Sequence, residues 1–457
     1  MPDPTALSRP AYLALAEQFA RAIESGALPI GARLMPHRKL ADALGLSVQT
    51  VSRAYDELIR RGLIAGEVGR GSFVLSPSGE ARQPYLPNRA GAVIDLSILK
   101  PVIDPAHLER FRQGFGWLAE NLSAGAALSF RPQAVMPRHW AVAVDWLGGL
   151  GVPATAAGMV ITNGVTPALT AAIMAVVPSG SGLAVEALTH HTIKPLCGYL
   201  GLHLDGVAMD GDGMIPAALD AVARRGHLRA VYLQPNVINP LARMMPADRR
   251  EELVQVAARH DLAVIENDSL GPLISDPVPR LASLAPDRVI HISGFSKYTV
   301  PGLRLAYLHA PPRFATAVAN RHLVAHWMAT PPMVELLSHW VREGVVADLA
   351  TGQARALEAR HDMAAQVLGA WMPVAHRRSL HLWLSLPTGW AEDGFVAQAQ
   401  LCGVAVAPAQ SFRATERDRK EAVRISLGST GAEELRRGLT VLRDILNQAP
   451  EVPLPTI

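Results

Sequence analysis

Residues 291–307 read HISGFSKYTVPGLRLAY, and the fold of the larger part of the chain can be worked out from this stretch. It begins within an apolar run, VIHIS, that is typical of a β-strand, and a segment dense in Gly, Ser and Pro then interrupts the run. Lys297 follows, among apolar residues that include Phe295, Tyr298 and Leu303. Desolvation in such surroundings lowers the pKa of a lysine and makes a nucleophilic amine available. A lysine on a solvated face is the structural alternative.

Further strand-like runs alternate with helical segments from residue 94 onwards. The runs include GMVITNG, GLAVEAL, LRAVYLQP and LAVIEND, and helical patterns separate them. Such alternation indicates βαβ units and a mostly parallel sheet, with ligands held at the carboxyl ends of the strands. The sequence therefore predicts an α/β domain in which functional residues directly follow the strands.

Polar residues do follow these strands. Asn163-Gly164-Val165-Thr166 comes after one strand, and its glycine permits a turn into a helix N-terminus, which suits an anion. Asn239-Pro240 and Glu266-Asn267-Asp268 follow two more, and Lys297 follows a fourth with Arg304 beyond it. Backbone amides, hydroxyls and a guanidinium suit a phosphate, whereas an amine suits an aldehyde. Together they predict pyridoxal 5′-phosphate, which proteins hold as a Schiff base on a lysine.

Over about 350 residues this region resembles the fold type I aminotransferases, and SGFSKYTVPGLRLAY (293–307) is its most specific motif. The resemblance implies that Lys297 forms the Schiff base and that Asn239 contacts the phenolic oxygen of the cofactor. It also implies that Arg424, in AVRISLG, grips the α-carboxylate of a substrate or effector. Taken singly, Asn239 suits a turn and Arg424 a surface position. Around the phosphate the resemblance places Val165, Thr166, Ser293, Ser296 and Arg304.

The chain departs from these relatives in the cofactor region. Leu241-Ala242 stands where Thr-Gly usually follows Asn-Pro. His190 stands where relatives carry an aromatic ring that stacks on the cofactor. We therefore expect His190 to stack on the cofactor rather than to lie in a surface loop. Relatives often carry Asp-x-x-Tyr after the strand AVI, and this register puts Asn267 in place of the aspartate and Leu270 in place of the tyrosine. An inward Asn267 makes the ring a poor electron sink, whereas an inward Asp268 preserves the sink.

Residues 10–76 predict a smaller domain of helices and a hairpin. A helical pattern covers 10–26, a short helix ends at Gly45, and SVQTVSRAYDELIRRG begins a third helix with Ser47 as its N-cap. Two helices joined by a short Gly-containing turn form a DNA-reading motif. The following LIAGEVGRGSFVL predicts two strands with Arg70 at the tip between them.

The stretch HRKLADALGLSVQTVSRAYDELIRRGLI (37–64) resembles the winged helix-turn-helix of the GntR family. Gln49 suits an adenine edge, and arginines suit guanine or phosphate. Many relatives carry an arginine where Val48 stands, so we expect Val48 to meet a thymine methyl. A helical domain with ordinary solvated arginines is the alternative, since the net charge through residue 75 is only +2. The residues that the resemblance implies face double-stranded DNA are Arg38, Ser47, Gln49, Thr50, Ser52, Arg53, Arg70 and Gly71.

We expect a winged helix-turn-helix domain at 1–76, a semi-rigid linker at 77–93 and an aminotransferase-like domain at 94–457. No apolar run reaches the roughly 20 residues of a membrane span, and the N-terminus lacks a signal-peptide pattern. The two cysteines give neither a disulfide framework nor a metal-ligand spacing. We therefore expect a cytoplasmic protein without a metal site.

Together the two domains resemble the MocR branch of the GntR regulators. This resemblance predicts a homodimeric transcriptional regulator that binds DNA and senses an amine or amino-acid effector through pyridoxal 5′-phosphate. The changes at Asn267, Leu241 and Leu270 argue against efficient turnover, although residual transaminase activity stays open. Two alternatives remain open. One is an active aminotransferase, and the other is a sensor of pyridoxal 5′-phosphate itself that controls vitamin B6 synthesis.

Overall fold

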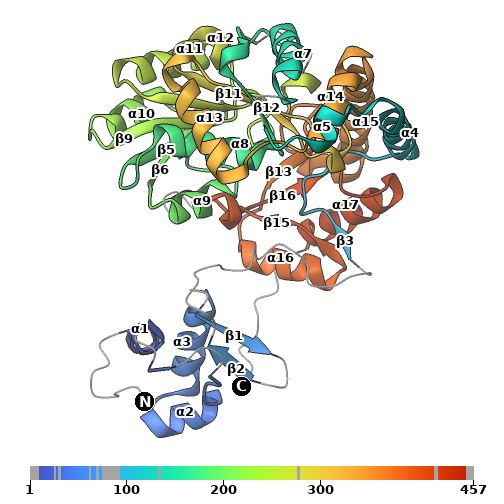
Figure 1. The fold of residues 1–457 in the computed structure, drawn as a ribbon. Coiled ribbons are helices and arrows are strands. Elements are labelled where there is room, and N and C mark those ends of the chain that lie inside the picture. The colour runs from blue at the N-terminus through green and yellow to red at the C-terminus, as the bar shows by residue number, and fades with distance from the viewer. Residues whose placement is uncertain are drawn as a thin grey trace. The chain divides into compact units, whose positions relative to one another are not determined.

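The computed structural model describes residues 10–24, 27–28, 32–60, 63–67, 71–74, 93–131, 135–274, 278–415 and 420–448. The chain forms two compact units, Met1–Leu86 and Pro87–Ile457 (Figure 1). Arg70 and the predicted linker, apart from residue 93, lie outside the described residues.

The described residues of the first unit form three helices and a two-stranded antiparallel hairpin around one apolar core. Gly45 ends α2 in the left-handed conformation at φ 65°, which glycine adopts without a steric penalty. Ser47 caps α3, because the Thr50 amide donates to Ser47 Oγ at 3.0 Å. The predicted helix-turn-helix and hairpin are thus confirmed. Their elements are α1 (Ala11–Glu24), α2 (His37–Leu44), α3 (Val48–Arg60), β1 (Ile64–Glu67) and β2 (Gly71–Val74).

A seven-stranded sheet forms the centre of the second unit, as predicted from the alternating pattern. Neighbouring strands are parallel except at β12, which runs antiparallel to both β4 and β11. Most of the sheet therefore has its carboxyl ends along one edge. In sheet order the strands are β4 (Met159–Thr162), β12 (Ala306–His309), β11 (Val289–Gly294), β10 (Ala263–Asn267), β9 (Leu228–Leu233), β5 (Gly182–Glu186) and β6 (His203–Val207).

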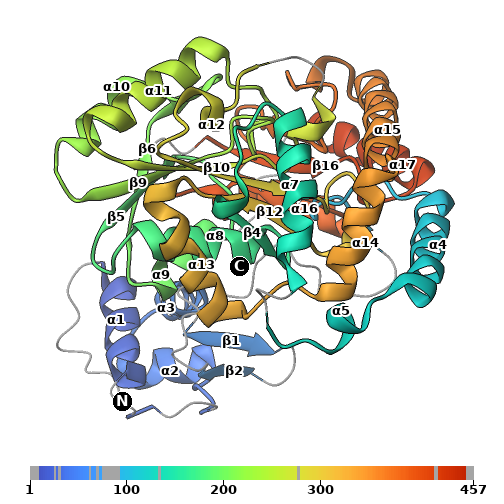
Figure 2. The same ribbon diagram turned by 45° about the horizontal axis from the view of Figure 1, so that its top comes forward.

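Helices cover both faces of this sheet (Figures 1 and 2). Alternate residues of a strand therefore enter two different apolar clusters, as Val264 and Ile265 of β10 do. One face packs against α8 (Val165–Val176), α9 (Ile193–Tyr199) and α13 (Pro312–His326). The other face packs against α7 (Pro137–Gly149), α10 (Pro216–Ala223), α11 (Ala247–Arg259), α12 (Leu281–Leu284) and α14 (Pro331–Arg342).

A three-stranded sheet with its own apolar cluster completes the second unit. It consists of β13 (His381–Ser385), β16 (Ala422–Ser426) and β15 (Ala407–Pro408), with α16 (Glu392–Leu401) and α17 (Ala432–Leu446) packed nearby. Beside it, β3 (Ile94–Asp95) pairs in parallel with β14 (Val404–Ala405). The other elements are α4 (Pro105–Asn121), α5 (Ala124–Leu128), α15 (Val345–Leu368), β7 (Met209–Asp210), β8 (Gly213–Met214), η2 (Ala156–Gly158), η3 (Gly271–Leu273), η4 (Pro301–Leu303), η5 (Gly369–Trp371) and η6 (Ala409–Phe412). Among the described residues, no helix has the length and apolar character to cross a membrane.

Candidate functional site

Lys297 lies just after β11, at the carboxyl edge of the large sheet. Its neighbours Phe295 and Tyr298 are fully buried, as the apolar character of the sequence predicts. The Lys297 Nζ donates a hydrogen bond to the Leu99 carbonyl oxygen at 2.7 Å. Burial is the largest cause that lowers the pKa of Lys297, and together with the nearby cations Arg424 and Arg304 it brings this pKa to about 8. The side chain is therefore an amine that loses its proton much more readily than a solvated lysine.

The N-terminus of α8 lies next to Arg304. Gly164 precedes α8 at φ 99°, and no side chain caps the helix there. A Cβ atom at Gly164 would lie 3.4 Å from Arg304 Nη2, so the glycine lets the guanidinium approach the helix end closely. The amides of Val165 and Thr166 have no partner within the helix, because they belong to its first turn. Free amides at a helix N-terminus beside a guanidinium suit an anion, and we call this group of Val165, Thr166 and Arg304 the anion cradle. Of the two predicted serines, Ser293 is buried in β11 and Ser296 is half-buried beside Lys297.

Arg424 lies in β16 with only 2% of its surface exposed, so it is not a surface cation. Its Nη1 donates to Asn239 Oδ1 at 3.1 Å, and its Nη2 donates to the Ser97 carbonyl oxygen at 2.8 Å. The guanidinium also lies 4.6 Å from the centre of the Phe412 ring. Asn239 is buried and precedes Pro240 through a cis peptide bond. The structure therefore joins two of the predicted residues, Arg424 and Asn239, directly.

His190 and His191 stack on each other near these cations, with ring centroids 4.4 Å apart. The His190 Nδ1 forms a 2.8 Å hydrogen bond with Thr192 Oγ1. Burial lowers the pKa of both histidines, and the charges of Lys297 and Arg424 act in the same direction; the pKa of His191 falls to about 3. Both rings are therefore neutral at pH 7. His191 was not among the residues predicted for the site, although the adjacent pair of histidines is visible in the sequence.

Asn267 and Asp268 make separate sets of hydrogen bonds at the end of β10. Asn267 Nδ2 donates to Tyr232 Oη at 2.9 Å, and Asn267 Oδ1 accepts from Ser269 Oγ at 2.6 Å. Tyr232 belongs to the apolar cluster on the α8 face of the sheet. Asn267 therefore lies toward the same face as the helix whose N-terminus forms the anion cradle.

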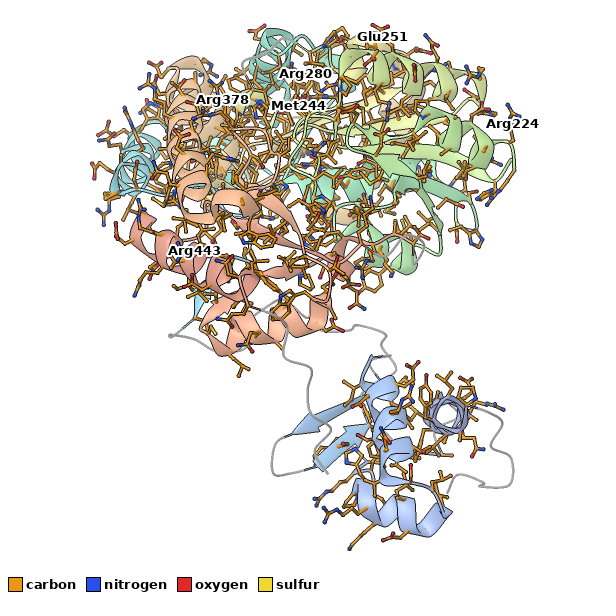
Figure 3. The ribbon with its side chains drawn as sticks, turned by 180° about the vertical axis from the view of Figure 1, so that it is seen from behind. Arg224, Met244, Glu251, Arg280, Arg378 and Arg443 are labelled. Atoms are coloured by element: carbon orange, nitrogen blue, oxygen red, sulfur yellow. The ribbon has the colours of Figure 1, made fainter. Side chains whose placement is uncertain are left out.

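Asp268 belongs to a different, buried cluster of polar side chains. Its two carboxylate oxygens accept from Asn236 Nδ2 and from Arg280 Nε, each at 2.6 Å. Burial opposes the charged form, but Arg280 and His291 hold the pKa of Asp268 below its usual value. Figure 3 labels Arg280 among the side chains of the second unit. Asp268 is thus an ionised partner of a structural arginine.

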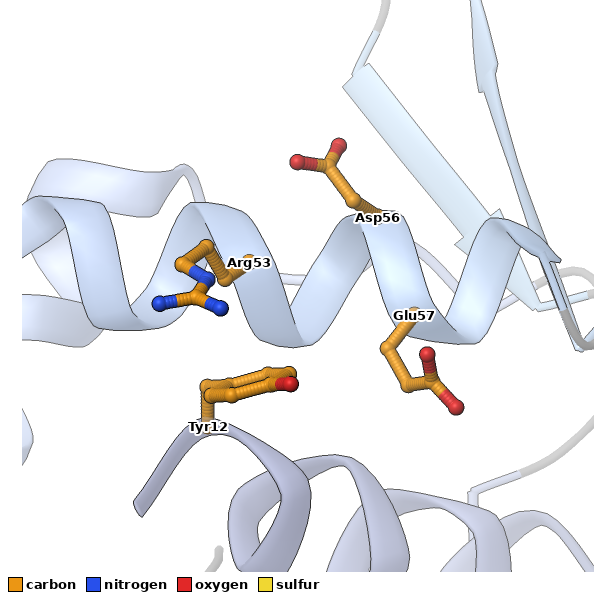
Figure 4. Close-up of a pocket in the computed structure, with 4 residues that line it drawn as sticks. All are labelled: Tyr12, Arg53, Asp56 and Glu57. Atoms are coloured by element: carbon orange, nitrogen blue, oxygen red, sulfur yellow. The ribbon is translucent and has the colours of Figure 1, made fainter. Parts of the chain in front are cut away.

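In the first unit, α3 presents its N-terminal turns to solvent. Ser47, Gln49 and Arg53 are exposed there, and Ser52 is half-buried. The Arg53 guanidinium lies 4.2 Å from the centre of the Tyr12 ring of α1. Figure 4 shows this pair in a shallow pocket that Asp56 and Glu57 of α3 also line.

The remaining residues predicted to face DNA lie in the same unit. Arg38 is exposed on α2, and Gly71 begins β2. Thr50 shares a 2.8 Å hydrogen bond between its hydroxyl and that of Ser47. Val48 is 45% exposed, which leaves its side chain available for an apolar contact. The described part of the chain holds no group of three or more His, Cys, Asp or Glu side chains suited to a metal ion.

Comparison with known families matches both units. Residues 11–74 match the model of the bacterial regulatory proteins of the gntR family, and residues 139–442 match that of aminotransferase class I and II. Among solved structures, the kynurenine aminotransferase of Pyrococcus horikoshii has a TM-score of 0.71 at 21% identity, covering 78% of this chain and 91% of that one. An archaeal alanine:glyoxylate aminotransferase has a TM-score of 0.72 at 20% identity, with 78% and 91% covered. These structures show the fold of the second unit.

Several transcriptional regulators are similar to this chain over 67% of its length or more. The uncharacterized HTH-type transcriptional regulator YdeF of Bacillus subtilis is 27% identical, covering 96% of this chain and 95% of that one. The HTH-type transcriptional regulator TauR of Rhodobacter capsulatus is 24% identical, with 93% and 94% covered. The HTH-type pyridoxine biosynthesis transcriptional regulator PdxR of Corynebacterium glutamicum is 26% identical, with 67% of each chain covered. The chain therefore belongs to the aminotransferase class I and II family in its MocR-type form, a transcriptional regulator that joins a GntR helix-turn-helix domain to an aminotransferase-like domain.

Proposed function

We propose that this regulator holds pyridoxal 5′-phosphate in its second unit and senses an amine or amino acid there, while its first unit binds promoter DNA. The observation that carries the proposal is the gathering of Lys297, Arg304 and Arg424 at one site. Both arginines lower the pKa of Lys297, so all three cations lie within electrostatic reach of one another. A lysine for an aldehyde, a cradle for a phosphate and a guanidinium for a carboxylate match the groups of the cofactor and of an amino acid.

The described residues fit the cofactor. Gly164 keeps the space beside Arg304 open, and the first amides of α8 lie at the same place. In our proposal Lys297 holds the aldehyde end, Asn239 the phenolic oxygen and His190 one face of the ring. Pyridoxal 5′-phosphate, when bound, supplies an electrophilic carbon that captures amines and a ring that withdraws electrons. The phosphate would be held by Val165, Thr166, Ser293, Ser296 and Arg304.

The electrostatics of the site favour an anionic ligand. Lys297, Arg304 and Arg424 are basic, whereas His190 and His191 are kept neutral by burial and by these neighbouring charges. A site of this kind attracts phosphates and carboxylates. Arg424 can hold an α-carboxylate with two parallel hydrogen bonds. Such a ligand changes DNA binding only by as much as it prefers one arrangement of the protein over another.

Asn267 supports a sensor in preference to an efficient aminotransferase. In our proposal Asn267, on the α8 face of the sheet, is the residue that meets the pyridine nitrogen, and Asp268 is held elsewhere by Arg280. An amide has no negative charge with which to keep that nitrogen protonated. The ring then withdraws electrons weakly, so an amino acid is bound without rapid conversion.

A second candidate is a sensor of pyridoxal 5′-phosphate itself. The similarity to PdxR, which is named as a regulator of pyridoxine biosynthesis, favours this candidate. In that case the cofactor alone changes DNA affinity, and no amine is needed.

One experiment tests the proposal and separates the candidates. The purified full-length protein is incubated with pyridoxal 5′-phosphate and then with a panel of amines, while the absorbance of the cofactor and the anisotropy of labelled promoter DNA are followed. A Lys297-dependent band that changes with an amine, together with a change in DNA affinity, supports the effector sensor. A change in DNA affinity with the cofactor alone supports the second candidate. Lys297→Ala is expected to abolish the band, and a band that persists in this variant contradicts the proposal.

A further inference from the structure

One short segment contacts both Lys297, proposed to bind the cofactor, and Arg424, proposed to bind the carboxylate of an amino acid. It runs from Asp95 to Lys100, at the start of the second unit. The Ser97 carbonyl oxygen accepts from Arg424 Nη2 at 2.8 Å, and the Leu99 carbonyl oxygen accepts from Lys297 Nζ at 2.7 Å. The segment therefore supplies an oxygen to the guanidinium on one side and to the ammonium on the other.

Asp95 fixes the conformation of this segment. Its Oδ1 accepts from the Ser97 amide at 2.9 Å and from the Ser97 hydroxyl at 2.6 Å. This local turn determines where the Ser97 carbonyl points. Because Asp95 holds Ser97, whose carbonyl oxygen accepts from Arg424, it acts on the site through the backbone.

Strands β14 and β16 both hold the same segment. The Leu96 amide donates to the Ala405 carbonyl at 2.8 Å, and the Ser426 amide donates to the Leu96 carbonyl at 2.7 Å. Gly428 lies so close that a Cβ atom there would come within 1.9 Å of the Lys100 carbonyl oxygen. The segment is thus attached to the small sheet, while Leu99 reaches the lysine that follows β11 of the large sheet.

We propose that Asp95–Lys100 is a competitive strap, whose two carbonyls occupy the cation positions until a ligand displaces them. This inference rests on the proposed function, because the displacing groups are the aldehyde end of the cofactor at Lys297 and a carboxylate at Arg424. A carboxylate forms a stronger, charge-assisted hydrogen bond with a guanidinium than a backbone carbonyl does, so the exchange favours the ligand. Asp95 is a positioning residue, since its two hydrogen bonds hold the strap where its carbonyls meet Arg424 and Lys297.

The strap offers a route from the ligand to the rest of the regulator. Asp95 lies close in sequence to the predicted linker at 77–93, and its strand β3 pairs with β14. Displacing Ser97 and Leu99 changes the backbone directly after that strand. The ligand therefore acts on the part of the second unit that is nearest in sequence to the DNA-binding unit.

Hydrogen exchange followed by mass spectrometry on the full-length protein tests the displacement. Pyridoxal 5′-phosphate is expected to speed exchange in a peptide covering residues 96–101 several-fold. Phosphopyridoxyl-L-alanine, which carries its own carboxylate, is expected to speed exchange at Ser97 beyond the effect of pyridoxamine 5′-phosphate, which lacks one. If no cofactor band forms, the proposed function fails; if the band forms and exchange in 96–101 is unchanged or slower, the strap is refuted.

A variant series provides a second readout. Asp95→Ala removes both hydrogen bonds to Ser97 and is expected to speed formation of the cofactor band about fivefold, because these hydrogen bonds stabilise the strap in place at Arg424 and Lys297. Asp95→Asn keeps an accepting Oδ1 and is expected to behave like wild type. Asp104→Ala is the matched control, because Asp104 caps α4 through the His107 amide and has no described contact with the strap.

The outcomes are distinguishable even if one variant is unstable. Equal rates for Asp95→Ala and wild type, with circular dichroism showing both folded, overturn the role of Asp95. Equal acceleration in Asp104→Ala also overturns it, since a general loss of rigidity then explains the effect. If Asp95→Ala does not fold, the hydrogen-exchange measurement on the wild-type protein decides the proposal.

Discussion

Position 267 illustrates how one atom changes what a cofactor site does. The Asn267 amide is held by Tyr232 on one side and Ser269 on the other, so its orientation is fixed by neighbours. Each of these hydroxyls can donate to a carboxylate as well as contact an amide. The surroundings therefore accept an aspartate with little rearrangement, although the chain carries none there.

Asn267→Asp is expected to increase transamination. A carboxylate facing the pyridine nitrogen keeps that nitrogen protonated and restores the electron-withdrawing ring. We expect about a tenfold faster conversion of an amino acid in single-turnover absorbance measurements. The reason is that raising the pKa of the pyridine nitrogen by one unit increases the ratio of its protonated to its neutral form tenfold. Asp268→Asn serves as the control, because it weakens the pair with Arg280 without changing the residue on the α8 face. A folded, cofactor-loaded Asn267→Asp protein with unchanged conversion contradicts the assignment of Asn267.

Capture of the cofactor is expected to depend on pH through Lys297. Since the pKa of this buried lysine is lowered to about 8, the fraction of Lys297 that is the neutral amine increases as the pH rises from 6 to 9. About a tenth of the side chain is neutral at pH 7, compared with less than a thousandth for a solvated lysine. The rate of band formation is therefore expected to rise about tenfold per pH unit below pH 8 and to level off above it. Stopped-flow absorbance at constant ionic strength measures this profile, and a rate that keeps rising beyond pH 9 contradicts the lowered pKa.

At the scale of elements, the N-terminus of α8 is the part of the proposed site that favours an anionic ligand. A helix of 12 residues begins there without a side-chain cap, and Arg304 lies against the glycine that precedes it. Arg304 adopts a left-handed conformation at φ 51°, which is uncommon for a residue with a side chain. Such a conformation is often retained at ligand sites, where it directs a side chain to its task.

Arg304→Gln is expected to weaken binding of pyridoxal 5′-phosphate by about 10- to 100-fold, because a charge-assisted hydrogen bond to the phosphate is lost. Binding of pyridoxal, which has no phosphate, is expected to change little. Arg313→Gln is a suitable control, since Arg313 lies on α13 and pairs with Asp261 at the surface. Absorbance titration gives both affinities, and an equal loss for the two ligands would argue for a general structural role of Arg304.

The elements and side chains of the site were more predictable than its backbone contacts. Alternating apolar runs predicted the sheet, and polar residues after the strands predicted where Lys297, Asn239 and Arg304 lie. The choice between Asn267 and Asp268 needed the partners Tyr232 and Arg280, which come from distant parts of the sequence. The Ser97 and Leu99 carbonyls could not be predicted, because every residue has such a group and only the fold brings these two to the cations.

At the scale of the whole molecule, the second unit exposes large apolar side chains close to one another. Phe130 is 82% exposed and Val324 is 87% exposed. Trp327, three residues after Val324, donates from Nε1 to the Phe130 carbonyl at 2.9 Å, which brings the two segments together. Leu128 is also exposed next to this group. Exposed apolar groups of this kind are typical of protein interfaces, and they support the proposed homodimer.

Val324→Lys is expected to shift the protein toward monomer. A charge placed in an apolar interface is left without a partner and loses its hydration. Light scattering after size-exclusion chromatography is expected to show the mass falling toward 48.9 kDa. Val374→Lys is the matched control, because Val374 is 72% exposed in a different part of the unit. A wild-type protein that is already monomeric, or a Val324→Lys protein that remains a dimer, contradicts the use of this surface.

The close approach of Gly428 to the Lys100 carbonyl has a consequence for genetics. Every single-nucleotide missense change in a glycine codon adds at least a methyl group, and the fold has no room for one at position 428. The backbone it meets is the end of the proposed competitive strap, so a mutant allele is expected to push the strap aside. If the strap carries the proposed ligand response, selections for constitutive regulation recover codon 428, in strains whose target promoter no longer responds to the effector.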